Sequence, residues 1–358
     1  MSNVGDMLRV ARQRLGFTQK LAAERLNVPQ PVLSRFENGV SEPDESLLER
    51  ASDAYSVPVE FFHVRETVFG PPVSVHAMLR GKADVTAREV DAITAELNIR
   101  VMQLRRFLEA VDFEPTTDVP VMDIEQYGSA EQIAELVRRH WRVPNGPVKN
   151  LMRLAEKAGV VVGLSEFGGA AVSGVTFRVP GRPPLILLNG THPGDRLRFT
   201  LAHELGHLVM HRFPTPEMEQ EANEFASALL MPAADIRPAF SGRRVTIELL
   251  ASLKPEWKVS MQSLLMRASN IGAITNNQSR YLWQQISSRG WRLREPASLE
   301  IAPERPSVLD SIIRTHLDTL GYTMPELSGL IPLYEGEFVS MYGLAADPDN
   351  RPKLRIVR

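Results

Sequence analysis

The stretch RLRFTLAHELGHLVMH, residues 196–211, decides how the centre of this chain folds and which chemistry it can carry. Its apolar residues recur at the spacing of a helix with one buried flank, at Phe199, Ala202, Leu205 and Val209. His203 and His207 stand four residues apart. A helix therefore places both imidazoles on one face, one turn above each other.

This pair of histidines, with Glu204 after the first, is typical of a zinc site. Both imidazoles can reach one metal ion at about 2.0–2.1 Å. Glu204 lies to one side of that ion, where it can take a proton from the attacking water and later pass it to the leaving amine. Gly206 lowers helix stability, which indicates that another backbone or the substrate passes close by. We therefore predict His203 and His207 as Zn²⁺ ligands and Glu204 as the catalytic base.

A catalytic zinc with two histidines needs a third protein ligand and an open position for water. The segment EQEANEFASALLMP, residues 219–232, predicts a second helix. The acidic residues near its start are Glu217, Glu219, Glu221 and Glu224. Glu221 precedes Phe225 by four residues and therefore lies at the edge of the buried face, so the phase of the helix favours it as the third ligand. Glu219 is the second candidate. The alternative is that all four acidic residues lie on a solvated face. We expect His211 to lie at the surface or behind the site, because a fourth ligand would remove the open position.

The composition is that of an ordinary globular protein with more than one core. The chain has 358 residues, 43% of them apolar, 23% charged and none cysteine, with a net charge of −2. This length predicts two or three domains, and the missing cysteines exclude disulfides and thiolate zinc sites. The polar residues 1–16 lack a signal core, and no window approaches the length of a membrane span. We expect a cytoplasmic protein without membrane contact.

The N-terminal residues 3–62 predict a run of short helices, within which TQKLAAERLNVPQPVLSRFENG, residues 18–39, fits a helix-turn-helix. The apolar residues that form its shared core are Ala22, Leu26, Val28, Leu33 and Phe36. The side chains that the second helix presents outward are Gln30, Pro31, Ser34 and Arg35. Glutamine and arginine read adenine and guanine edges, and Gln19 opens the first helix, where it could hold a phosphate.

Local charge supports a nucleic-acid partner for this segment. Residues 1–36 contain the acidic Asp6 and Glu24 and six basic side chains, Arg9, Arg12, Arg14, Lys20, Arg25 and Arg35. A one-sided basic patch in a nearly neutral chain suits a DNA backbone. The alternative is a helical protein-interaction module with a solvated polar face. We predict double-stranded DNA as the partner.

The remaining segments suggest linkers and accessory helices. Residues 84–111 predict one amphipathic helix about 40 Å long, which either packs on a neighbouring domain or forms a homodimer with coiled-coil character. In residues 279–296, arginines alternate with tyrosine and tryptophan. This pattern indicates one of two roles: nucleic-acid contact, or tryptophans that pack on the core beside solvated arginines. We favour the second role. Residues 308–321 predict a helix within a C-terminal region that could sense a partner or gate the site. The predicted domains are residues 1–64, 65–120, 121–300 and 301–358.

Two family resemblances complete this picture. Residues 127–290, with AHELGHLVMH and EQEANEFASALLMP, resemble the ImmA/IrrE zinc metallopeptidases, and residues 4–62 resemble the XRE family of helix-turn-helix domains. The first resemblance implies a small antiparallel sheet, Glu221 as third zinc ligand, and limited proteolysis of a protein, typically a helix-turn-helix repressor. The second implies a fold-supporting pair between Arg12 and Glu37. Pro31, near the start of the second motif helix, departs from the XRE pattern.

The resulting fold class is mainly α, with a five-helix N-terminal domain, a long linker helix, a small α+β peptidase domain and a helical C-terminal region. The leading functional prediction is a DNA-binding transcriptional regulator fused to a zinc-dependent endopeptidase that cleaves a repressor or itself. A non-catalytic repressor or antitoxin, which uses the peptidase-like domain for sensing, is the alternative. A housekeeping peptidase whose helix-turn-helix only docks substrate is a third possibility.

Overall fold

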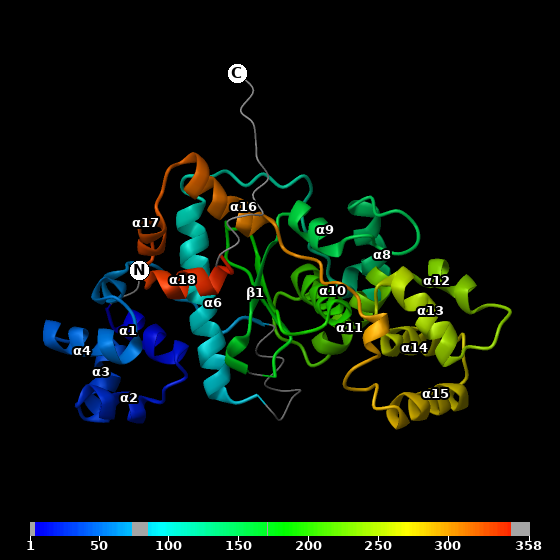
Figure 1. Cartoon of the computed structure of the whole chain (residues 1–358), viewed down its shortest axis with the longest axis horizontal. Helices are drawn as coiled ribbons and strands as arrows, with labels where there is room; N and C mark the ends of the chain where they lie inside the picture. Colours follow the sequence, from blue (N-terminus) through cyan, green and yellow to red (C-terminus); the bar gives the residue numbers. More distant parts are fainter. Residues whose placement is uncertain (1–3, 74–84, 170, 345–358) are drawn as a thin grey trace, which may run out of the picture.

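A computed structural model describes residues 4–73, 85–169 and 171–344 of the chain (Figure 1). The N-terminal domain, a long upright helix and a larger domain around three strands follow one another across the molecule (Figure 1). The N-terminal elements are α1 (Val4–Arg14), α2 (Gln19–Leu26), α3 (Gln30–Glu37), α4 (Glu45–Tyr55) and the 3-10 helix η1 (Val59–His63). These five helical segments, four α-helices and one 3-10 helix, agree with the five helices that we expected.

The turn between α2 and α3 follows from its residues. Thr18 caps α2 by accepting a hydrogen bond from the amide of Leu21. Asn27 ends that helix in the left-handed conformation, with φ 53° and ψ 49°, which asparagine tolerates well. Pro29 is extended and opens α3. This short turn is what a helix-turn-helix requires.

The long helix α6 (Ala87–Phe107) lies between the two domains. A capping box formed by Thr86 and Glu89 fixes its start. On one side it contributes Ala95, Ile99 and Met102 to the core of the N-terminal domain. On the other side it contributes Ile93, Leu97, Leu104 and Phe107 to the core beneath the sheet. The prediction that this helix packs on neighbouring domains is confirmed, while a homodimer stays a prediction.

The sheet of the second domain is small and mixed. Its strands are β1 (Val161–Ser165), β2 (Gly174–Phe177) and β3 (Leu185–Asn189), in the order β1-β3-β2. β1 runs parallel to β3 and β2 runs antiparallel to it. The expectation of an antiparallel sheet is wrong for the first pair. Because β1 and β2 run in opposite directions, β3, which lies between them, must be parallel to one of them. Both faces are covered, which explains the continuous apolar run in β3.

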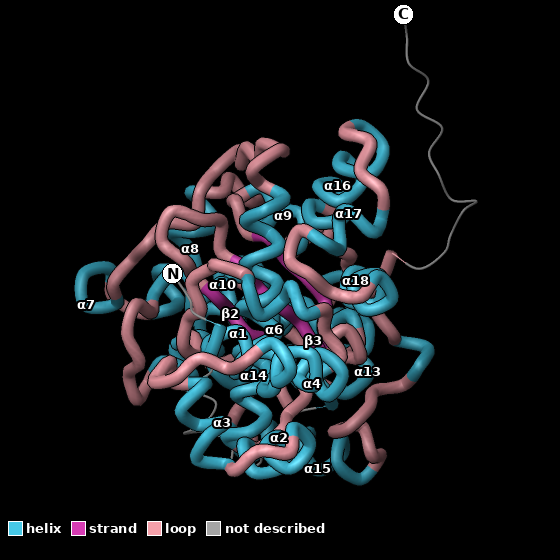
Figure 2. Tube along the Cα trace, turned by 90° about the vertical axis from the view of Figure 1, so that its left-hand side faces the viewer, coloured by secondary structure: helices cyan, strands magenta, loops and turns pink. Residues whose placement is uncertain are grey.

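Helices cover both faces of the sheet, and Figure 2 shows the strands enclosed among them. Val162, Ile186 and Leu188 face the larger core, which α8 to α15 complete. The bounds of these helices, with the preceding α7, are α7 Ile124–Tyr127, α8 Ala130–His140, α9 Leu151–Lys157, α10 Gly194–Met210, α11 Met218–Leu230, α12 Ala233–Phe240, α13 Ile247–Trp257, α14 Met261–Asn270 and α15 Asn276–Ser288. Trp283 and Trp291 pack against this core, as the favoured alternative for residues 279–296 predicts.

The C-terminal region returns across the sheet to the N-terminal domain. It contains α16 (Val308–Arg314), a π-helical turn at Thr315–Thr319, α17 (Met324–Gly329) and α18 (Glu335–Tyr342), so two short helices occur beyond the single helix that we expected. Leu309, Ile312 and Ile313 cover the sheet. Ile331 and Leu333 belong to the core of the N-terminal domain. Within the described part of the chain, no helix has the length and apolarity needed to cross a membrane.

Candidate metal centre and nucleic-acid interface

The two histidines of α10 converge on one point. The Nε2 atoms of His203 and His207 lie 3.0 Å apart. Helix α11 crosses α10 closely at Gly206, where an added Cβ would lie 3.1 Å from the Phe225 ring and 3.3 Å from the Cα of Ala222. The expectation that another backbone passes Gly206 is therefore confirmed, and this close approach brings the acidic start of α11 to the histidines.

The carboxylate that joins the histidines is Glu219. Its Oε1 lies 3.2 Å from Nε2 of His207, and its Oε2 lies 3.7 Å from Nε2 of His203. Two ligand atoms at about 2.0–2.1 Å from a tetrahedral zinc are roughly 3.3 Å apart, so these three side chains fit a zinc ion. His203, His207 and Glu219 are also the group whose ligand atoms all lie within 4.8 Å of one another.

Glu221, the third ligand that helix phase and family resemblance favoured, lies elsewhere in the structure. Its Oε2 is 3.1 Å from Nε2 of His211. The reason is the crossing of the two helices: α10 contacts α11 through Ala222, and Glu219 is three residues before Ala222, on the same face. Glu219, the second candidate from the sequence, therefore lies beside the two histidines, where we expected Glu221.

Each of these two histidines has a partner for its second ring nitrogen. Nδ1 of His203 lies 3.1 Å from Oδ1 of Asn223, and Nδ1 of His207 lies 2.8 Å from Nδ1 of His211. Burial, and then the neighbouring His207 and His203, lowers the pKa of His211 to about 3. Burial, followed by Glu217 and Glu224, raises the pKa of Glu221. We expected His211 at the surface or behind the site, and its contacts with His207 and Glu221 agree with the second of these positions.

Glu204 is buried and held by β2. The hydroxyl of Thr176 lies 2.6 Å from Oε2 of Glu204 and donates a hydrogen bond to it. β2 can approach α10 this closely because residue 174 is glycine: a Cβ there would lie 2.6 Å from Cγ2 of Thr200. Thr176 was missed in the sequence, although the alternation of GVTF, with Val175 and Phe177 in the core, indicates that Thr176 faces the other side.

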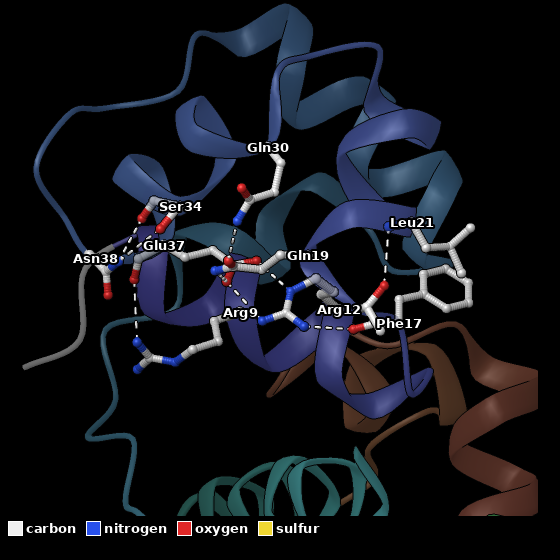
Figure 3. A network of polar contacts seen from close by, with 10 residues as sticks. Arg9, Arg12, Phe17, Gln19, Leu21, Gln30, Ser34, Glu37 and Asn38 are labelled. Atoms are coloured by element: carbon white, nitrogen blue, oxygen red, sulfur yellow. Dashed lines mark hydrogen bonds and ion pairs between the residues drawn. The ribbon is translucent and has the colours of Figure 1, made fainter. Parts of the chain in front are cut away.

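In the N-terminal domain, a polar network connects α1, α2 and α3 (Figure 3). Nε and Nη2 of Arg12 donate to the two carboxylate oxygens of Glu37 at 2.5 and 2.8 Å. The pair that the XRE resemblance implied is thereby confirmed. Nε2 of Gln19 donates to Glu37 at 2.9 Å, and Nε2 of Gln30 donates to Oε1 of Gln19 at 2.9 Å. Gln19 and Gln30 are thus brought together at the start of the two motif helices.

The other predicted DNA contacts lie on α3. Pro31 and Arg35 are exposed and Ser34 is half-buried. Pro31 is the second residue of α3, within its first turn, where the missing amide hydrogen breaks no helical bond. Their contacts with DNA stay predictions.

Comparison with known proteins agrees with both halves of this structure. Residues 8–62 match the helix-turn-helix family model, and residues 155–269 match the model described as IrrE N-terminal-like domain. The HTH-type transcriptional regulator ImmR of Bacillus subtilis (strain 168) is 30% identical over 104 residues, which are 29% of this chain and 68% of the relative.

Fold and comparisons together define a class of protein in which an N-terminal helix-turn-helix domain is fused to an ImmA/IrrE-like peptidase domain. Its fold is mainly α, with a small sheet. The chain belongs to the XRE-type helix-turn-helix transcriptional regulators, and its second domain is of the ImmA/IrrE type.

Proposed function

We propose that this regulator is a zinc-dependent endopeptidase whose helix-turn-helix domain binds an operator. The proposal assigns His203, His207 and Glu219 as zinc ligands and Glu204 as the catalytic base. The observation that carries it is the convergence of two Nε2 atoms and one carboxylate, 3.0 to 3.7 Å apart, in helices α10 and α11. The division into residues 1–64, 65–120, 121–300 and 301–358 belongs to the same proposal.

The chemistry follows from the groups around the metal position. A zinc ion there would polarise the scissile carbonyl and lower the pKa of the attacking water. Glu204 takes the proton from that water and transfers it to the leaving amine. The Thr176 hydroxyl holds one oxygen of Glu204 by a 2.6 Å hydrogen bond, so the carboxylate is oriented before a substrate arrives. An extended substrate backbone would pair with the outer edge of β2, near residues 173–177, by β-augmentation.

The proposed substrate is a protein, and specifically a helix-turn-helix repressor. The ImmA/IrrE resemblance supports this choice, and the fused N-terminal domain supports a role at the same operators. Gln19, Gln30, Pro31, Ser34 and Arg35 are the proposed DNA contacts. In this scheme, the N-terminal domain brings the chain to an operator and the second domain removes a repressor, which changes transcription.

Replacement of Glu204 by Gln tests the enzymatic part. We expect the variant to retain zinc, because Glu204 is not a ligand, and to lose cleavage of candidate repressors together with derepression. The matched control is Glu224→Gln on the exposed face of α11, where Glu224 accepts a hydrogen bond from Gln220. Metal analysis, a cleavage assay and operator binding are the measurements. If Glu204→Gln keeps its zinc and cleaves as the control does, Glu204 is not the catalytic base. If neither the unchanged chain nor the control cleaves, a non-catalytic sensing role takes the place of the enzymatic one.

A further inference from the structure

Glu221 and His211 form a pair directly behind the zinc ligand His207. Glu221 lies on α11, and His211 follows the last residue of α10. Their ring-to-carboxylate distance is 3.1 Å, and the second nitrogen of the same ring lies 2.8 Å from His207. We propose that Glu221 and His211 are positioning residues that fix the orientation and tautomer of His207. This inference rests on the proposed zinc function.

The direction of each hydrogen bond follows from the ligand role of His207. Nε2 of His207 faces Glu219 and the other histidine, so it offers its lone pair to the metal. A neutral imidazole then carries its hydrogen on Nδ1. Nδ1 of His207 donates to Nδ1 of His211, whose own hydrogen must therefore lie on Nε2. From there His211 donates to Oε2 of Glu221, so every nitrogen in the chain of contacts has one defined role.

The surroundings keep this arrangement in place. The side chain of His211 is 4% exposed and that of Glu221 is 25% exposed. Water has little access to the ring and does not readily replace either partner. Outer hydrogen-bond partners of this kind raise the basicity of a ligand histidine and prevent its ring from turning. Loss of such a partner typically weakens metal binding by about 10–100-fold.

The other ligand is held differently, which makes an internal comparison possible. Nδ1 of His203 faces Oδ1 of Asn223, and Nδ2 of Asn223 donates to the backbone oxygen of Glu219 at 2.7 Å. That second bond sets which end of the amide faces His203. Every second residue from Glu219 to Asn223 in α11 therefore has a different role. Glu219 reaches the metal position, Glu221 orients His207 through His211, and Asn223 orients His203.

The test is the zinc affinity of the full chain, measured by competition with a chelator. We expect Glu221→Leu and His211→Leu to weaken zinc binding by about 10–100-fold. Glu221→Gln should restore most of the affinity, because its amide oxygen still accepts the bond from His211. Glu219→Gln should cost more than either, since it removes a ligand. Glu224→Leu is the matched control on the same helix, and circular dichroism confirms that each variant is folded.

The outcomes separate this inference from the proposed function. If the unchanged chain does not bind zinc, the proposed function fails. If the unchanged chain binds zinc and both leucine variants bind as tightly, the positioning role is wrong. If Glu221→Gln loses as much affinity as Glu219→Gln, Glu221 is itself a ligand and the inference is overturned. Since Glu221 is partly exposed, its leucine variant gives an answer even if His211→Leu does not fold.

Discussion

Glu37 accepts hydrogen bonds from two other helices of the N-terminal domain. Arg12 of α1 binds both of its oxygens, and Gln19 of α2 shares one of them. Because Gln30 donates to Gln19 and Gln19 donates to Glu37, the amide of Gln30 is connected to the buried ion pair through one intermediate residue. Side chains that are ordered before binding lose less entropy on contact with DNA. The Arg12–Glu37 pair thus stabilises the fold and also orders side chains of the proposed DNA-binding surface.

Arg35 is the exposed side chain of α3 with the strongest expected effect on DNA binding. We predict that Arg35→Ala weakens operator affinity by about 1–3 kcal/mol and relaxes the preference at one base position. The reason is the loss of a guanidinium that binds a guanine edge through two hydrogen bonds. Titration of the full chain against operator variants measures both effects. Arg153→Ala, an exposed arginine on α9, is the control; equal effects of the two substitutions would contradict the assigned recognition helix.

At this scale, the sequence predicted His203, His207 and Glu204 but could not choose between the carboxylates at the start of α11. Helix phase compares each acidic residue with the buried stripe of its own helix, and this comparison favoured Glu221 over Glu219. The choice depends instead on which side of α11 meets α10, and that contact is made at Gly206 and Ala222. Such a crossing between two helices is a tertiary property. The glycine indicated a close approach, but not which residue of α11 would fill it.

Among the elements, the crossing of α10 and α11 determines the geometry of the candidate metal centre. Gly206 lies against Ala222 and Phe225, so the axes of the two helices come close only while residue 206 has no side chain. Glu219 is one turn before this contact, within reach of both histidines. The spacing of the helices therefore sets the distance from the carboxylate to the imidazoles.

Gly206→Ala should weaken zinc binding although it raises intrinsic helix propensity. Alanine favours the helix by about 1 kcal/mol, whereas overpacking a tight contact costs about 1–3 kcal/mol. The added methyl group would push α11 away by a few tenths of an ångström and carry Glu219 with it. Gly336→Ala in α18 has no atom within 4 Å of the new methyl group and serves as control. Zinc titration should separate the two variants, and equal affinity for both would contradict the role of this contact.

Elements were easier to predict from the sequence than their arrangement. Three apolar runs separated by glycine and proline are typical of buried strands, and they contain the three observed strands: VVVGLSEF (residues 160–167), AVSGVTFRV (171–179) and PPLILLN (183–189). The predicted apolar stripe in residues 84–111 contains α6; residue 84 itself lies outside the described residues. Strand order was not accessible, because apolar runs carry no information on which neighbour each strand pairs with. The insertion of β3 between β1 and β2 made the sheet mixed.

In the whole molecule, the two domains share an element and are joined a second time by the C-terminal region. α6 belongs to both cores, and Ile331 and Leu333 fill the core of the N-terminal domain from the other end of the chain. Arg14 of α1 forms an ion pair with Glu337 of α18. A movement of the N-terminal domain on DNA would therefore have to break contacts with residues that also rest on the sheet.

Leu333→Ala tests this second connection. Leu333 is 4% exposed, and truncation of such a side chain costs about 2–5 kcal/mol through lost burial and a cavity. We expect faster amide hydrogen exchange in α1 and α6 and a lower unfolding midpoint of the N-terminal domain, with unchanged zinc affinity. Leu320→Ala, at a position 44% exposed, is the matched control. Equal exchange in both variants would show that the C-terminal region does not stabilise the N-terminal domain.

The position of Ile331 and Leu333 in the chain has a consequence for synthesis. Domains generally fold as units while the ribosome is still working, the N-terminal one first. Here the first domain receives two of its buried side chains only after the peptidase domain has been translated. A chain interrupted before residue 331 lacks both side chains, so its helix-turn-helix domain has an open apolar flank. The DNA-binding half therefore acquires all of its buried contacts only in a copy whose second domain has already been translated.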